Sequence, residues 1–179
     1  MTARNMMAES VQNPEETSLE ATSNANRPNP LVPVRMRGIA GSQDPAQLSA
    51  VARANPARLL KAYELARMAA QLSQDSKAQD ILLLDMRKLT SLVDFFVVVT
   101  VPSRRQASAI AGQIELEMKK LKESKLSLEE SDTGRWTLLD FGDVVIHLFS
   151  PEGRDFYNLE DVWGDAPRLD WKDANLKIN

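Results

Sequence analysis

The apolar run VDFFVVVTV, at residues 93–101, constrains the fold more than any other stretch of this sequence. It is too short and too apolar for a surface helix and is rich in aromatic and β-branched residues, so it predicts a buried strand. A second apolar run, DILLLDMRKL at 80–89, precedes it and predicts another buried strand. Strands of this kind need helices packed on the sheet.

The flanking sequence supplies those helices. Asn55 followed by Pro56 is typical of a helix start, and Ser103 precedes a second run of apolar residues at helical spacing. The stretch at 126–131 predicts a short strand, 134–149 a hairpin, and 151–165 a turn with one or two short helices. The resulting order of elements predicts an α/β fold with a mixed β-sheet sandwiched by helices.

Residues 1–54 have a different composition from the rest of the chain. They contain five of the nine prolines and no aromatic residue, so they cannot bury enough apolar surface to offset the entropy of ordering. The sequence therefore predicts a disordered N-terminal arm at 1–54 and one α/β domain at 55–179. The basic spot PVRMRG at 33–38 is interpreted as solvated linker in preference to an RNA contact.

Several classes of protein are disfavoured by composition. The absence of cysteine excludes disulfides and thiolate metal sites and is compatible with a reducing interior. No apolar run approaches the roughly 20 residues that span a membrane, and the N-terminus lacks the apolar core of a secretory signal. We therefore expect a cytoplasmic protein with no membrane contact.

The charge of the chain is unevenly distributed. Residues 78–179 contain thirteen lysines and arginines against eighteen acids, a net charge of −5, whereas residues 1–77 have a net charge of +2. Phosphate backbones are bound by lysine and arginine, so an acidic domain is expected to make little direct contact with nucleic acid. A basic protein is the better match for a macromolecular partner.

The hairpin at 134–149 supplies the candidate binding site. If Phe141 and Gly142 form its turn, Asp140 pairs with Asp143, and one face of the hairpin holds six residues. These are Trp136, Leu138, Asp140, Asp143, Val145 and His147. A large aromatic side chain among aliphatic and charged neighbours is typical of a protein-binding hot spot. The other face, with Thr137, Leu139, Val144, Ile146 and Leu148, reads as core.

Other interpretations of the same residues stay open. Trp136 belongs to the core if a helix covers its face, and Asp140 and Asp143 are turn acids on turn chemistry alone. His147 is the only histidine and reads as structural, since it has no cysteine or second histidine as co-ligand. We predict no catalytic, cofactor-binding or metal-binding residue.

The alternative function is a metal-dependent, nucleotidyltransferase-like enzyme that handles nucleotides. The acid pairs Asp140 with Asp143, or Asp85 with Asp94, would hold magnesium in that interpretation. The sequence has no glycine-rich phosphate loop, and Ser103 has no histidine in a recognisable triad arrangement. Chemistry is therefore the weaker hypothesis.

Three segments resemble one known family. DILLLDMRKLTSLVDFFVVVT, GRWTLLDFGDVVIHLF and RDFYNLEDVWGDAPRLDW are together similar to the ribosomal silencing factor family, also called RsfS or Iojap, over residues 78 to about 171. The resemblance implies a nucleotidyltransferase-like topology without the catalytic motif. It also implies a factor that binds the large ribosomal subunit through ribosomal protein L-fourteen. Such a factor sterically blocks the small subunit and represses translation under nutrient limitation.

The resemblance also bears on the binding residues. The family's binding surface includes the tryptophan of the GRW strand and the acids after it, which correspond to Trp136, Asp140 and Asp143, with Leu138 between them. It predicts that Trp136→Ala or Asp140→Lys abolishes binding and leaves the fold intact. The family also implies a homodimer as a state to test. One departure is the turn TVPSRRQ at 100–106, where the family reads close to TGTSDRQ.

Overall fold

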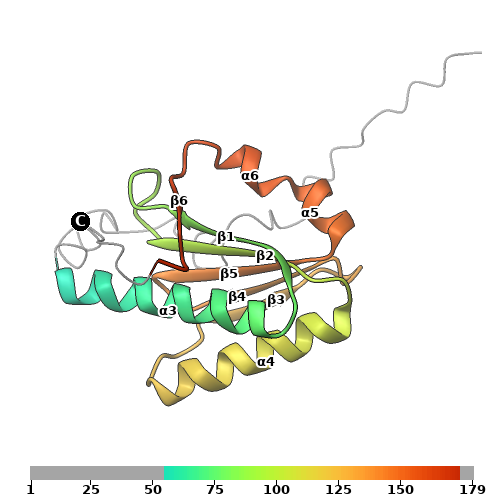
Figure 1. Cartoon of the computed structure of the whole chain (residues 1–179), viewed down its shortest axis with the longest axis horizontal. Helices are drawn as coiled ribbons and strands as arrows, with labels where there is room; N and C mark the ends of the chain where they lie inside the picture. Colours follow the sequence, from blue (N-terminus) through green and yellow to red (C-terminus); the bar gives the residue numbers. More distant parts are fainter. Residues whose placement is uncertain (1–54, 174–179) are drawn as a thin grey trace, which may run out of the picture.

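The computed structural model describes residues 55–173, so the predicted disordered arm at 1–54 lies outside the described residues. Figure 1 shows that the described part of the chain begins with the long helix α3 and returns to the sheet with β6 near its end. Its helices are α3 (Pro56–Asp75), α4 (Arg104–Lys120), α5 (Pro151–Tyr157) and α6 (Leu159–Val162). Its strands are β1 (Gln79–Asp85), β2 (Phe95–Thr100), β3 (Ser127–Glu130), β4 (Trp136–Asp140), β5 (Val144–Phe149) and β6 (Arg168–Leu169).

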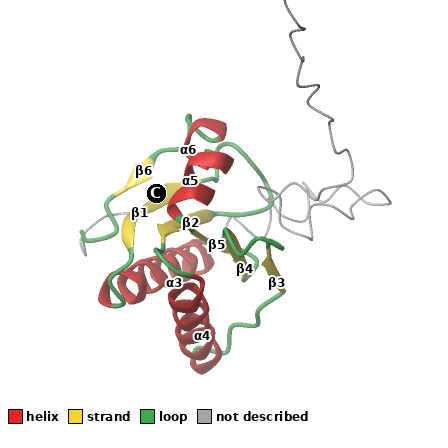
Figure 2. Cartoon of the chain, turned by 90° about the vertical axis from the view of Figure 1, so that its right-hand side faces the viewer, coloured by secondary structure: helices red, strands yellow, loops and turns green. Residues whose placement is uncertain are grey.

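One sheet organises these elements, in the strand order β3-β4-β5-β2-β1-β6. The ladder between β2 and β5 is parallel and the other four ladders are antiparallel, so the sheet is mixed. Helices α3 and α4 lie on one side of the sheet, and α5 and α6 lie on the other (Figure 2). The predicted α/β fold with a mixed sheet between helices is confirmed. The two-residue strand β6 was not predicted.

The helices begin where the sequence indicates. The side chain of Asn55 accepts a hydrogen bond from the backbone N–H of Ala57 at 3.0 Å, and that of Ser103 accepts from Gln106 at 3.2 Å. Both side chains satisfy donors that a helix start leaves unpaired. Asn158 has a left-handed backbone with a φ of 42°, which separates α5 from α6. The prediction of one or two short helices in this segment is confirmed, and the structure has two.

The sheet has a core on each face. All six residues of β2 are buried, as the run FFVVVT predicts for a strand covered on both sides. The face toward α3 and α4 receives Leu139, Val144, Ile146 and Leu148 from the hairpin. The face toward α5 and α6 receives Trp136, Leu138, Val145 and Phe149. The hairpin therefore contributes apolar side chains to both cores.

The predicted register of the hairpin is wrong by two residues. Asp140 pairs with Val145, Leu138 with His147 and Trp136 with Phe149, so the loop is longer than the predicted Phe141–Gly142 turn. Gly142 does have the positive φ, 89°, that such a turn requires. A shift of two residues keeps every strand residue on its predicted face, because side chains alternate with a period of two. Only Asp143 leaves its predicted strand position and moves into the loop.

Candidate protein-binding site

Burial divides the six predicted binding residues into two groups. Trp136 is 5% exposed, and Leu138, Asp140, Val145 and His147 are each 0% exposed. Asp143 alone is partly exposed. The expectation that this hairpin face is an open surface is therefore wrong in this structure. The open alternative, that a helix covers the face and Trp136 belongs to the core, describes what is observed.

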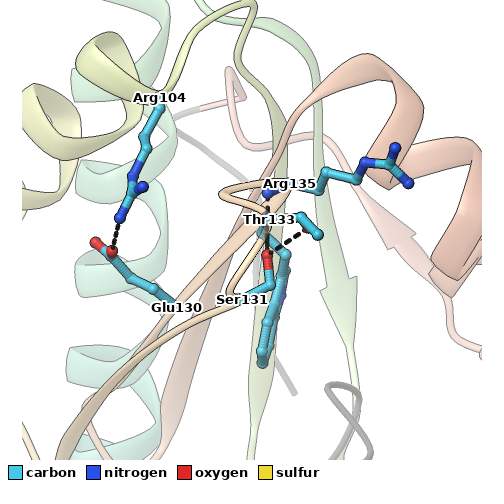
Figure 3. Close-up of polar contacts among 6 residues, drawn as sticks. Arg104, Glu130, Ser131, Thr133 and Arg135 are labelled. Atoms are coloured by element: carbon cyan, nitrogen blue, oxygen red, sulfur yellow. Dashed lines mark hydrogen bonds and ion pairs between the residues drawn. The ribbon is translucent and has the colours of Figure 1, made fainter.

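The turn between β3 and β4 positions Trp136 at the start of its strand. The hydroxyl oxygen of Ser131 accepts hydrogen bonds from the backbone N–H groups of Arg135 at 3.0 Å and Trp136 at 3.2 Å. Arg104 reaches from the start of α4 to Glu130, with 3.1 Å between Nη2 and Oε2 (Figure 3). The sequence SDTGRW therefore folds as a tight turn that fixes the strand carrying the tryptophan.

Aromatic contacts tie Trp136 to α5. The indole N–H donates to Nδ1 of His147 at 3.2 Å. The ring lies 6.4 Å from Phe149 and 6.1 Å from Tyr157, between ring centroids. Tyr157 belongs to the last turn of α5, so the tryptophan packs against the side of that helix that faces the sheet. Trp136 holds the helical segment that packs over it.

His147 has a structural role in this arrangement. Its Nδ1 accepts from Trp136, so the proton of the neutral ring lies on Nε2, which has no hydrogen-bond partner among the described residues. Burial, together with the positive charge of Arg154, lowers the pKa of His147 to about 3. The ring is therefore neutral throughout the physiological range. Among residues 55–173, no three histidine, aspartate or glutamate side chains gather as a metal site.

This buried histidine predicts an acid-sensitive fold. The unfolded chain binds a proton near pH 6.5 and the folded chain only near 3, so stability is lost as the pH falls between these values. The loss is about 1.4 kcal/mol per pH unit, or about 2 kcal/mol at pH 5. Urea unfolding at pH 7.5 and 5.0 measures it. His147 is the only histidine, so His147→Gln should lose this component, and an unchanged slope in that variant would contradict the assignment.

The two acids of the hairpin do not form a pair. Oδ1 of Asp140 accepts a hydrogen bond from the backbone N–H of Gly142 at 2.8 Å, which is a turn-forming contact. Asp143 binds the guanidinium of Arg58 at the start of α3 through both carboxylate oxygens. That bond raises the pKa of Arg58. Arg58 was not identified from the sequence, because it lies 85 positions from Asp143.

Two strongly exposed apolar side chains lie on α5 and α6. Phe156 is 67% exposed and Val162 is 55% exposed. We call residues 151–165 the helical cover; it contains five acids against one arginine, and Arg154 is bonded to Glu160 at 2.6 Å. Sequence reasoning missed this surface, although its acid content was an available signal.

The fold and this surface describe an α/β domain whose accessible features on this side include exposed apolar side chains among acids, a composition typical of protein-binding surfaces. The sequence profile described as "Ribosomal silencing factor during starvation" matches residues 60–179. The chain belongs to the RsfS family of ribosomal silencing factors. It is a ribosome-silencing regulator of translation and not an enzyme. The alternative nucleotidyltransferase-like enzyme is therefore wrong.

Relatives occur in bacteria and in plants. The chain is 39% identical over 104 residues to ribosomal silencing factor RsfS of Bacillus subtilis, a match that covers 58% of this chain and 88% of the relative. It is 42% identical over 109 residues to the chloroplastic protein Iojap of Arabidopsis thaliana, covering 61% of this chain and 44% of the relative.

Solved structures share the fold. A crystal structure from Chromobacterium violaceum has a TM-score of 0.54 at 38% identity and covers 56% of this chain and 84% of that one. A crystal structure from Bacillus halodurans has a TM-score of 0.52 at 33% identity and covers 60% and 97% respectively. No helix in residues 55–173 is both long and apolar enough to cross a bilayer.

Proposed function

We propose that this chain binds the large ribosomal subunit through ribosomal protein L-fourteen and sterically blocks the small subunit. Translation then falls when nutrients are limiting. The family assignment supports the ribosome as target, and the net charge of −5 over residues 78–179 suits a basic ribosomal protein. Repression of this kind needs a stable complex and no turnover, which agrees with a protein that is not an enzyme.

The observation that carries this proposal is the exposed Phe156 on an acidic helical cover. An exposed aromatic side chain of this size is typical of an interface anchor. Asp155 lies beside it, and Asp161 lies beside the exposed Val162, all on the solvent side. The acids would steer a basic partner toward the surface, and the apolar side chains would be desolvated on contact. Direct nucleic-acid binding would be minor on this acidic surface.

The predicted hairpin residues affect partner binding mainly by supporting the helical cover. Asp143 is the member accessible for direct contact, whereas Trp136 acts through Tyr157, whose ring lies 6.1 Å away. In this proposal Leu138 and Val145 belong to the core on which the cover packs, and His147 supports Trp136 through its hydrogen bond. Asp140 shapes the loop that carries Asp143. A change at any of them alters the shape of the surface that the partner meets.

Phe156→Ala is expected to weaken binding to purified large subunits about 30-fold or more, because loss of an interface anchor costs about 2 kcal/mol. Co-sedimentation over a range of protein concentrations measures the affinity. Leu60→Ala is the matched control, since Leu60 is 53% exposed and lies on α3, on the opposite side of the sheet. Equal affinity of Phe156→Ala and Leu60→Ala would overturn the assigned surface.

The remaining expectations accompany this proposal. We infer a cytoplasmic location, as for a factor that meets bacterial ribosomes, although the Arabidopsis relative is chloroplastic. A homodimer is a further state that sedimentation would reveal. A nucleotidyltransferase-like topology without a catalytic motif stays a prediction of the family resemblance.

A further inference from the structure

The outer edge of β3 is the second surface with unusual exposure. β3 has four residues and pairs only with β4 in the described part of the sheet. Leu128 within it is 46% exposed, and Leu126 just before it is 58% exposed. Apolar side chains beside an open strand edge form a surface on which a further extended segment can pair.

The two faces at this edge differ in character. Leu128 pairs with Leu139, whose side chain lies in the core under α3 and α4. Leu126 falls on the same side as Leu128 by the alternation of side chains. Glu129 pairs with Leu138, whose side chain lies in the other core. An added strand therefore meets the two leucines on one side, followed by Glu130 and its partner Arg104, and Glu129 on the other side.

The sequence contains a segment with the matching pattern. LVPVRMR, at residues 31–37, alternates Val34 and Met36 with Arg35 and Arg37. In an extended conformation the two apolar side chains point to one side and the two arginines to the other. No acid occurs from 21 to 43, so the segment has only positive charge. Pro33 is compatible with an outermost strand when its nitrogen faces solvent.

We propose that residues 31–37 pair with β3 of the same chain as an additional edge strand. Val34 and Met36 cover Leu126 and Leu128, and the arginines lie on the side of Glu129. The backbone supplies the affinity, and the alternation of apolar and basic residues supplies the specificity. This inference is independent of the proposed ribosome contact, which lies on α5 and α6.

The linker between residues 31–37 and α3 is long enough to reach β3, and α3 starts at the same end of the sheet as β3. Residues 38–54 join the segment to α3, and 17 extended residues span up to about 55 Å. Lys61, in the second turn of α3, forms an ion pair with Glu123, three positions before Leu126. The start of α3 and the start of β3 therefore lie at the same end of the sheet. A tether of this length gives the segment a high effective concentration at the edge.

The charge of the edge favours this occupant over a second copy of β3. The strand carries Glu129 and Glu130, and Glu123 precedes it; Glu130 is paired with Arg104 and Glu123 with Lys61. A second copy of β3 would add the same acids to the edge, and like charges across neighbouring strands are unfavourable. The arm segment adds arginines in their place.

Cysteine pairs in the full-length chain test the proposal, because the chain has no cysteine of its own. Two variants combine Leu128→Cys with Met36→Cys or with Val34→Cys, so that a register shift of two residues is covered. The control combines Met36→Cys with Leu60→Cys, which is similarly exposed and nearer in sequence. Oxidation in dilute solution is followed by non-reducing electrophoresis and mass spectrometry.

At least one Leu128 pair is expected to form an intramolecular disulfide ten-fold faster than the control. Replacing Arg35 and Arg37 by glutamate should remove most of this advantage, and adding Glu129→Lys should restore part of it. Rates equal to the control for both pairs would overturn the proposal. Predominant covalent dimers would also overturn it and identify a second copy as the occupant.

Discussion

The free energy of unfolding is expected to fall by about 3–5 kcal/mol when Trp136 is replaced by alanine. The side chain is 5% exposed and contacts His147, Phe149 and Tyr157, so its removal leaves a large cavity beneath α5. It also leaves Nδ1 of the buried His147 without its donor. Urea unfolding at neutral pH measures the change. This expectation replaces the one from family resemblance, in which the fold stays intact.

The matched control for this variant is Leu116→Ala, because Leu116 is 55% exposed on α4. Its free energy of unfolding should change by no more than about 0.5 kcal/mol. If Trp136→Ala unfolds like the control and yet loses ribosome binding, the tryptophan contacts the partner directly. The helical cover would then have to move aside in the complex.

Asp140→Lys is expected to be the other severely destabilising change, with a loss of about 3–5 kcal/mol and a drop in Tm of about 10 °C or more. Asp140 is 0% exposed, and lysine brings a longer side chain and an opposite charge to the same buried position. The substitution also removes the acceptor for the backbone N–H of Gly142. Calorimetry of the full-length chain measures the shift.

Asp140→Asn separates the two causes. Asparagine keeps an oxygen that accepts from Gly142 and introduces no charge, so most of the stability should remain. A Tm for Asp140→Lys within about 2 °C of wild type would show that this position opens to solvent. In that case Asp140 would again be a candidate for direct contact with the ribosomal partner.

Local signals in the sequence predicted most of the fold. The caps at Asn55 and Ser103 act within three residues of each helix start, and the run FFVVVT identifies its strand by composition alone. β6 was not predicted, because a strand of two residues has no periodic pattern in the sequence. Its pairing with β1 depends on residues more than 80 positions away.

The register of the hairpin was predicted wrongly, whereas the face of the sheet on which each strand residue lies was predicted correctly. Gly142 indicated the turn, yet turn residues alone do not set how many residues the loop contains. The faces were still assigned correctly, because the register differs by an even number of residues.

Solvent exposure at the site was beyond sequence reasoning. Whether Trp136 faces water depends on where α5 lies, and that depends on long-range contacts such as Arg154 with the backbone oxygen of Asp80. The same contacts leave the side chain of Phe156 exposed to solvent. The predicted site thus contained Trp136, the most buried tryptophan, and lacked Phe156, the most exposed aromatic side chain of the described residues.

The order of strands has a consequence for the solubility of this protein. β2 and β5, FFVVVT and VVIHLF, have the composition of aggregation-prone segments, with high β-propensity and no charged side chain at neutral pH, since His147 is neutral. They pair with each other at the centre of the sheet, while the outermost strands, SLEE and RL, are short and charged. Intermolecular strand addition therefore meets glutamates or an arginine first, and the segments most prone to form fibrils stay out of reach while the sheet is intact.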